Sequence, residues 1–126
     1  SRLSKPLPDA LTADDLTTIL GNLLDNAFES TLKNPASSKQ ISLLISDQSN
    51  ELVIEVADNG TGIDPTIADT IFERGVTTKE ENGHGYGMYL IQRYVSHAGG
   101  HIILDDADPV GAIISLFIPL QGQAYE

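Results

Sequence analysis

Leu52-Val-Ile-Glu-Val-Ala-Asp-Asn-Gly-Thr-Gly-Ile63 is the stretch of sequence that decides the fold. Its first seven residues alternate between two faces, which predicts a β-strand with Leu52, Ile54 and Val56 on the buried face. The same period of two places Asp58 on that apolar face. A carboxylate is costly there unless donors satisfy it, so this residue points beyond simple packing.

The turn after Asp58 contains two glycines, Gly60 and Gly62. Glycine has no Cβ, so the backbone there can approach a bound group closely. An acceptor side chain in an apolar recess beside bare backbone suits a flat heterocycle with an amino group, and adenine is the obvious candidate. The alternative interpretation is a strand that ends in an Asx turn, and the stretch alone leaves both open.

Length and composition limit the class of protein. The 126 residues, 40% of them hydrophobic, predict one domain with a single core. The absence of cysteine excludes a disulfide framework and a thiolate zinc site, and fits a reducing compartment. The formal net charge of −11 argues against nucleic-acid binding, because phosphate contacts need a basic patch. No apolar run approaches the length of a membrane span, so we expect a soluble domain.

Residues 1–11 hold two prolines and no periodicity, and we interpret them as a linker from an upstream segment, with one domain over 12–126. Thr12 and Asp15 have the spacing of a capping box and predict the start of a helix. Apolar residues then recur on one helical face. They are Leu16, Ile19, Leu20, Leu23, Leu24, Ala27 and Phe28.

Asn22, Asn26 and Glu29 border this apolar stripe. Asparagine is a poor helix former, so two of them one turn apart in mid-helix carry a cost in propensity. They form either a solvated polar flank or, in the sharper interpretation, a pair of amide oxygens that face a hydrated divalent cation.

Ile41 to Ser46 alternates as a half-buried strand, and a turn at 47–50 predicts an antiparallel hairpin with the strand at 52–58. Asp64-Pro65 predicts a short helix through Phe72. Residues 73–82 form a long polar segment without periodicity, which is typical of a lid or binding loop.

Gly83-His-Gly-Tyr-Gly87 ends that segment as a glycine-spaced turn and runs into an amphipathic helix that Gly99-Gly100 stops. Such a turn at a helix N-terminus is a site for anions, phosphate among them, although glycine alternation alone is a weak signal. Two further strands follow, at 101–105 and 112–119. The pattern predicts an α+β fold: a two-layer sandwich with a mixed, mostly antiparallel sheet and helices on one face.

Four segments in register resemble the motifs of one family. Residues 20–27 resemble the N box, 58–62 the G1 box, 71–75 the F box and 83–87 the G2 box of the ATP-binding catalytic domain of bacterial two-component sensor histidine kinases. This superfamily has the Bergerat fold and includes gyrase B, the heat-shock-90 chaperones and MutL. The amino-acid sequence at 23–29 and 75–79 is most similar to the branch of these kinases that senses citrate and C4-dicarboxylates.

The resemblance implies that the domain binds Mg-ATP and transfers the γ-phosphoryl group to a histidine on a separate dimerisation helix of the same kinase. Asn26 would ligate Mg²⁺ and Asp58 would receive the adenine amino group. The residues that it places at the ATP site are Asn22, Asn26, Asp58, Gly60, Gly62, Ile63, Arg74, Thr78, Lys79, Gly83, His84, Gly85, Tyr86, Gly87 and Met88. It further implies a downstream response regulator, a monomeric isolated domain, and a cytoplasmic position in an inner-membrane sensor.

Three departures from the family pattern limit the transfer. Glu29 stands where many histidine kinases carry a lysine, and Ala112 stands where a threonine hydroxyl is frequent. None of the three histidines, His84, His97 and His101, sits in an acceptor-like motif. Two other functions stay open: an ATPase of the gyrase or MutL kind, for which Asn22 replaces the general-base glutamate, and a module that binds ATP without catalysis.

Overall fold

The computed structural model describes residues 7–9, 11–62 and 84–120. Two long helices, one short 3₁₀ helix and four strands follow one another along these residues. In chain order they are α1 (Ala13–Ser30), η1 (Ala36–Ser38), β1 (Ile41–Gln48), β2 (Glu51–Asp58), α2 (His84–His97), β3 (His101–Asp106) and β4 (Ala112–Pro119).

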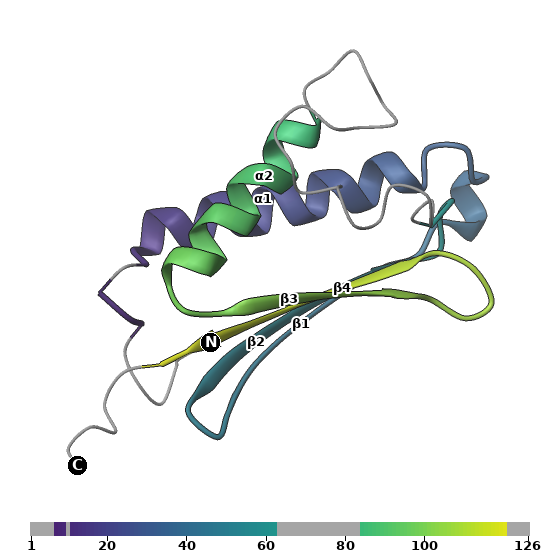
Figure 1. The fold of residues 1–126 in the computed structure, drawn as a ribbon. Coiled ribbons are helices and arrows are strands. Elements are labelled where there is room, and N and C mark those ends of the chain that lie inside the picture. The colour runs from purple at the N-terminus through teal and green to yellow at the C-terminus, as the bar shows by residue number, and fades with distance from the viewer. Residues whose placement is uncertain (1–6, 10, 63–83, 121–126) are drawn as a thin grey trace.

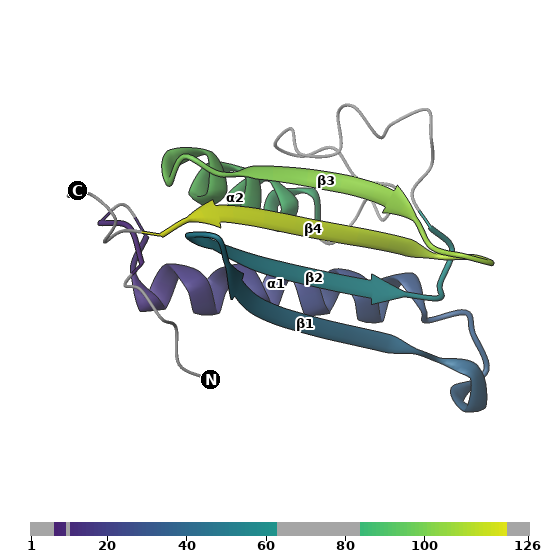
Figure 2. The ribbon, with the colours of Figure 1, turned by 90° about the horizontal axis from the view of Figure 1, so that it is seen from below.

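The strands form one sheet in the order β1-β2-β4-β3. Both long helices lie on the same face of it (Figure 1), and the view from below shows the other face open (Figure 2). The predicted two-layer α+β sandwich is therefore confirmed. All three pairings are antiparallel, so in the described part of the chain the sheet is not mixed as predicted. The β3–β4 hairpin inserts its second strand beside β2, which makes the central pair antiparallel as well.

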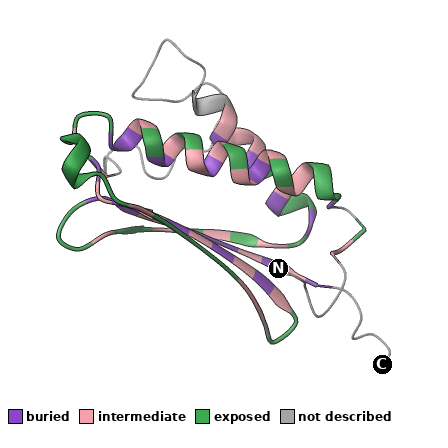
Figure 3. Ribbon diagram, turned by 180° about the vertical axis from the view of Figure 1, so that it is seen from behind, coloured by how far each residue is buried: buried purple, intermediate pink, exposed green. Residues whose placement is uncertain are grey.

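The core lies between the two helices and the two central strands (Figure 3). Every second residue of β2 is buried, as the sequence predicts, and Asp58 ends that buried row. On β4 the predicted inward face is also confirmed. Its four residues, all at most 3% exposed, are Ala112, Ile114, Leu116 and Ile118.

α1 begins with the predicted capping box. The backbone N–H of Asp15 donates to the Thr12 hydroxyl at 3.0 Å, and the N–H of Thr12 donates to the Asp15 carboxylate at 3.1 Å. Ile19 and Ala27 are buried as predicted, but Phe28 is 59% exposed, so its place in the predicted apolar stripe is wrong. Each residue turns an α-helix by about 100°, and Phe28 is thereby carried off the face that Ala27 buries.

β1 is an edge strand and is more exposed than the sequence predicts. Leu43 is 43% exposed, Leu44 54% and Ile45 38%. Leu43 pairs with Val56 on β2, so both side chains lie on the side of the sheet that carries the helices. The predicted half-buried strand is wrong in this respect because α1 packs on β2, the next strand inward, and leaves the edge uncovered.

The turns follow the expected chemistry. Ser49 and Asn50 both have positive φ, 50° and 68°, as the two central residues of a type I′ hairpin turn require. At the end of α2, Gly99 has a φ of +82°, and the N–H of Gly100 donates to the carbonyl of Val95 at 2.9 Å. This is the Schellman arrangement that the Gly-Gly pair predicts.

The packed part of the domain reaches back before α1. Leu11 is 3% exposed and belongs to the core, and Leu7 packs against it. The last residues of the predicted linker therefore contact the domain. None of the helices in the described ranges is long and apolar enough to cross a membrane.

Candidate nucleotide site

Asp58 ends β2 on the buried face and is only 6% exposed. Its Oδ1 accepts hydrogen bonds from the backbone N–H of Gly60 at 2.8 Å and from the hydroxyl of Ser30 at 2.9 Å. These two donors offset the cost of burying the carboxylate. The Gly60 bond is the Asx turn of the alternative interpretation, and it leaves Oδ2 without a partner among the described residues. The geometry is therefore compatible with a ligand that donates to Oδ2.

Ser30 is a residue that the sequence reasoning missed. It is the last residue of α1, is 8% exposed, and its carbonyl accepts from the N–H of Thr61 at 3.1 Å. The signal was present, because Ser30 continues the row of buried positions of α1 three residues after Ala27. A hydroxyl in such a row needs a partner, and that partner is Asp58.

Three chain segments approach each other so closely at this point that only glycine fits. A Cβ on Gly60 would collide with the backbone and hydroxyl of Ser30. Gly111 has a φ of +118°, and a Cβ on it would collide with the carbonyl of Asp58. The end of α1, the end of β2 and the start of β4 are thus held together through bare backbone.

Ala112 lies directly opposite Asp58 in the β2–β4 register and is 3% exposed. Its methyl group is on the same face as the carboxylate but offers no donor. The sequence left open whether a hydroxyl stands beside Asp58. In the structure a hydroxyl does lie beside Asp58, and it belongs to Ser30 in the helix layer.

A second part of the predicted site lies where α1 meets α2. The side-chain Nδ2 of Asn22 donates to the carbonyl of Thr18 at 2.9 Å. Its Oδ1 lies 2.6 Å from the place where a Cβ on Gly87 would stand. Asn22 in the N box and Gly87 in the G2 box are therefore neighbours, as the resemblance implies.

Asn22, Asn26 and Ser30 follow one another at a spacing of four residues on α1. In an α-helix this spacing makes a single row that rises about 12 Å over the eight residues. One end of this polar row is at Asp58 and the other at the first turn of α2. Asn26, in the middle, is partly buried, and its side chain has no hydrogen-bond partner in the described part of the chain.

The first turn of α2 differs from the prediction. The helix begins at His84, so His84, Gly85, Tyr86 and Gly87 are helical, whereas a loop up to Gly87 was predicted. The first backbone N–H groups of a helix have no partner within it, and they therefore belong to these residues. Met88, the next predicted site residue, is 3% exposed and packs in the core.

Several predicted features lie outside the described residues. They are the short helix at 64–72, the polar segment at 73–82, and the site residues Ile63, Arg74, Thr78, Lys79 and Gly83. Gly62, just before this range, has a φ of +80°. A Cβ on Gly62 would lie 3.2 Å from the carbonyl oxygen of Gly111.

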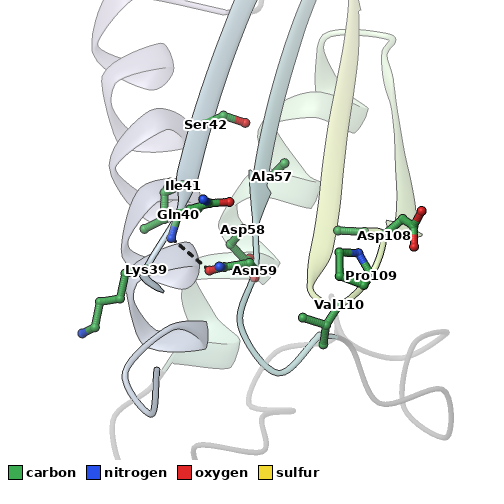
Figure 4. Close-up of a pocket in the computed structure, with 11 residues that line it drawn as sticks. Lys39, Gln40, Ile41, Ser42, Ala57, Asp58, Asn59, Asp108, Pro109 and Val110 are labelled. Carbon is green, nitrogen blue, oxygen red and sulfur yellow. Dashed lines mark hydrogen bonds between the residues drawn. The ribbon is translucent and has the colours of Figure 1, made fainter. Parts of the chain in front are cut away.

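Asn59 holds the loop between α1 and β1. Its side chain accepts from the N–H of Gln40 at 2.9 Å, the bond drawn in Figure 4, and from the side chain of Asn34 at 3.1 Å. It also donates to the carbonyl of Ser38 at 2.6 Å. The residue beside Asp58 in the G1 box is therefore structural in this fold.

A hollow of about 700 Å³ lies at the same end of the sheet, between the ends of β1 and β2 and the β3–β4 turn (Figure 4). Ser42 and Ala57, which line it, pair with each other on the open face of the sheet. Of the predicted ATP-site residues within the described ranges, only Asp58 borders the hollow. It is therefore distinct from the row on α1.

The described residues contain no group of three or more His, Cys, Asp or Glu side chains that could hold a metal ion. Asn26, the predicted Mg²⁺ ligand, would offer a neutral amide oxygen and leave the other ligand positions to water and phosphate, as Mg²⁺ commonly prefers. His97 and His101 are both exposed, and His101 stacks on Phe117 with ring centroids 4.9 Å apart. Neither borders the site.

The chain is similar to several known proteins. The family model described as "Histidine kinase-, DNA gyrase B-, and HSP90-like ATPase" matches residues 12–122. Sensor histidine kinase CitA of Klebsiella pneumoniae is 47% identical over 90% of this chain and 21% of its own length. A probable C4-dicarboxylate sensor kinase of Bacillus subtilis is 32% identical over 92% of this chain and 22% of its own.

Among solved structures, full-length ShkA in complex with AMPPNP superposes with a TM-score of 0.72 at 28% identity, covering 97% of this chain and 25% of ShkA. The chain thus spans about a fifth of the length of the curated relatives it matches. Both of these curated relatives are named as sensor kinases. The chain belongs to the histidine kinase-, DNA gyrase B- and HSP90-like ATPase family, as its four motifs predict.

Proposed function

We propose that this domain binds Mg-ATP along the row Asn22–Asn26–Ser30 and transfers the γ-phosphoryl group to a histidine on a separate dimerisation helix. The observation that carries the proposal is the arrangement of the two ends of this row. Asp58 offers a buried acceptor at one end, and the first turn of α2 offers backbone N–H groups at the other. Adenine and phosphates need these two kinds of surface, in this order.

At the adenine end, Oδ1 of Asp58 is occupied by two donors and Oδ2 is the acceptor that an amino group would use. A guanine base would present a carbonyl at that place, and two acceptors would then face each other. The loss amounts to about 1–3 kcal/mol, or roughly five- to 150-fold in affinity, in favour of ATP over GTP.

At the phosphate end, Asn26 would hold Mg²⁺ through its amide oxygen, with phosphate oxygens and water as the other ligands. Bound there, the ion would neutralise charge on the phosphates during transfer. Asn22 and the first turn of α2, with Gly85 and Gly87, would orient the phosphates. His84, Tyr86 and Met88, with Gly60 and Gly62 at the base, complete the proposed site in the described ranges.

Residues beyond these ranges extend the proposal. Ile63, Arg74, Thr78, Lys79 and Gly83 would complete the nucleotide site. The relatives support a longer protein: CitA is a sensor histidine kinase, and the Bacillus subtilis relative is a probable C4-dicarboxylate sensor kinase. We accordingly propose a cytoplasmic, monomeric catalytic domain of an inner-membrane sensor for citrate or a C4-dicarboxylate, with a response regulator downstream.

Calorimetric titration and phosphotransfer test the proposal together. The domain should bind ATP with Mg²⁺ and prefer it to GTP, and Asp58→Ala should lose this binding while its circular dichroism stays native. With γ-labelled ATP, the domain alone should neither label itself nor release phosphate at a useful rate. Its cognate dimerisation hairpin, added in trans, should acquire an acid-labile and base-stable label on histidine.

Each alternative outcome has a distinct meaning. Rapid phosphate release without a hairpin would support an ATPase of the gyrase or MutL kind, although Asn22 offers no carboxylate as a general base. Tight ATP binding without transfer to the hairpin would support a module that binds nucleotide without catalysis. Equal affinity for ATP and GTP would overturn the role of Asp58.

A further inference from the structure

We propose that Ser30 is the positioning residue that lets Asp58 recognise the adenine amino group. The inference rests on the proposed nucleotide site and adds a residue that the motif resemblance does not include. Ser30 is at the end of α1 and Asp58 at the end of β2, so their bond joins the helix layer to the sheet. Both side chains are buried, at 8% and 6% exposure.

The two oxygens of the Asp58 carboxylate differ in their hydrogen-bond partners. The Ser30 hydroxyl and the Gly60 N–H both donate to Oδ1, at 2.9 Å and 2.8 Å. A carboxylate with one oxygen held by two donors from different elements cannot rotate without losing one of them. Oδ2 is thereby fixed as the acceptor that remains for a ligand, and its direction is set before the ligand arrives.

The backbone of Ser30 makes a further contact with the same turn. Its carbonyl accepts from the N–H of Thr61, so the same residue also holds the turn that follows Asp58. A Cβ on Gly60 would collide with Ser30, which shows how closely this turn lies against the end of α1. Ser30 at the end of α1 thus holds both the carboxylate and the glycine turn beside it.

The neighbouring strand β4 offers no side-chain donor to Asp58. Ala112 pairs with Asp58 and carries no donor, so within the described residues Ser30 is the one side chain that donates to the carboxylate. If Ser30 is removed, Oδ1 keeps only the Gly60 N–H. The carboxylate then gains rotational freedom, and the geometry of its bond to an amino group is lost in part.

The experiment separates recognition of the amino group from binding in general. Affinity is measured by calorimetry for ATP and for purine riboside triphosphate, which has hydrogen in place of the 6-amino group. The ratio of the two dissociation constants reports the amino-group contact alone. In the unmodified domain we expect ATP to bind on the order of tenfold more tightly or better, the effect of one hydrogen bond to a charged group.

In Ser30→Ala this ratio should fall toward one, mainly because ATP binds more weakly, while the affinity for purine riboside triphosphate changes little. A general loosening of the domain would weaken both ligands alike and leave the ratio unchanged, which would overturn the proposal. Ser30→Ala with Ala112→Ser supplies a hydroxyl to Asp58 from β4, and it should recover part of the ratio. Absence of recovery, with both variants folded by circular dichroism, would also count against it.

The control for the proposed function is the unmodified domain. If it binds both triphosphates equally, Asp58 does not read an amino group and the proposed function fails at that point. If it discriminates and Ser30→Ala discriminates as well, only the role of Ser30 is refuted. Should Ser30→Ala fail to fold, Ser30→Cys, a side chain of similar size with a weaker donor, gives an intermediate ratio if the proposal is right and an unchanged ratio if it is wrong.

Discussion

The side-chain oxygen of Asn22 on α1 lies 2.6 Å from the position that a Cβ on Gly87 of α2 would take. Gly87→Ala should therefore displace Asn22 from the phosphate end and weaken Mg-ATP binding about tenfold, the effect of losing one hydrogen bond of about 1.4 kcal/mol. Gly21→Ala on the exposed side of α1 is the control, because no atom lies within 4 Å of its Cβ. It should keep the affinity and raise the free energy of unfolding by up to about 1 kcal/mol. Equal titration curves for both variants would contradict this role of Gly87.

Asn26 provides the test of the metal. Asn26→Ala should weaken binding of Mg-ATP much more than binding of adenosine, because adenosine brings no phosphate and no Mg²⁺. Calorimetry with both ligands, in the presence and absence of Mg²⁺, measures the difference. Asp25→Ala, one residue earlier and exposed, is the control and should leave both affinities unchanged. If Asn26→Ala weakens the two ligands equally, Asn26 supports the fold and not the metal.

Asn59 is predicted to contribute to stability and not to nucleotide recognition. Asn59→Ala removes its bonds to Gln40, Asn34 and Ser38 and should lower the free energy of unfolding by about 1–3 kcal/mol. Asn59→Asp keeps the acceptor for Gln40 and Asn34 but places a second acceptor against the carbonyl of Ser38, so it should also lower the free energy of unfolding. Urea unfolding followed by circular dichroism ranks the two variants. An unchanged free energy of unfolding in both variants, or a loss of ATP binding in a variant that stays folded, would contradict this role of Asn59.

Gly111 and Gly99 both have positive φ but differ in their surroundings. At Gly99 the nearest atom to a Cβ is 3.6 Å away, so Gly99→Ala should cost only the backbone strain of about 1–2 kcal/mol. At Gly111 a Cβ would also collide with the carbonyl of Asp58. Gly111→Ala should therefore destabilise the domain more and weaken ATP binding, whereas Gly99→Ala should leave binding unchanged. Thermal unfolding with and without ATP distinguishes the two effects.

The sequence predicts secondary structure and burial best where a periodic pattern arises from the burial of one face. The alternation of β2 and β4 and the stripe of α1 around Leu23 are confirmed because burial on a single face imposes them. The exposure of Leu43 and Phe28 was not predictable, since the pattern says that a residue is apolar but not how far the neighbouring layer extends. The helical start at His84 was missed because the glycines favour a loop locally, and α1 packs against that segment.

The polar residues of the candidate site were predictable from the sequence, but the residue that holds Asp58 in place was not. Asp58 and Asn26 stand out because a polar group in an apolar pattern needs an explanation. Ser30 is small and follows a stripe of apolar residues, and only the contact across 28 positions reveals its partner. Such a contact depends on how two layers meet, which no local pattern contains.

The meeting of Ser30, Asp58 and Gly111 has a consequence for how the protein is made. These residues come from α1, β2 and the turn before β4, so the proposed adenine end is complete only once residues 30–111 have been synthesised and have folded together. Until then the proposed site for the base is incomplete, and ATP that binds there would stabilise only the folded domain. At a concentration one hundred times its dissociation constant, a ligand of this kind adds about 2.7 kcal/mol to the free energy of unfolding. ATP bound at the proposed site would thus favour the native state of newly released chains.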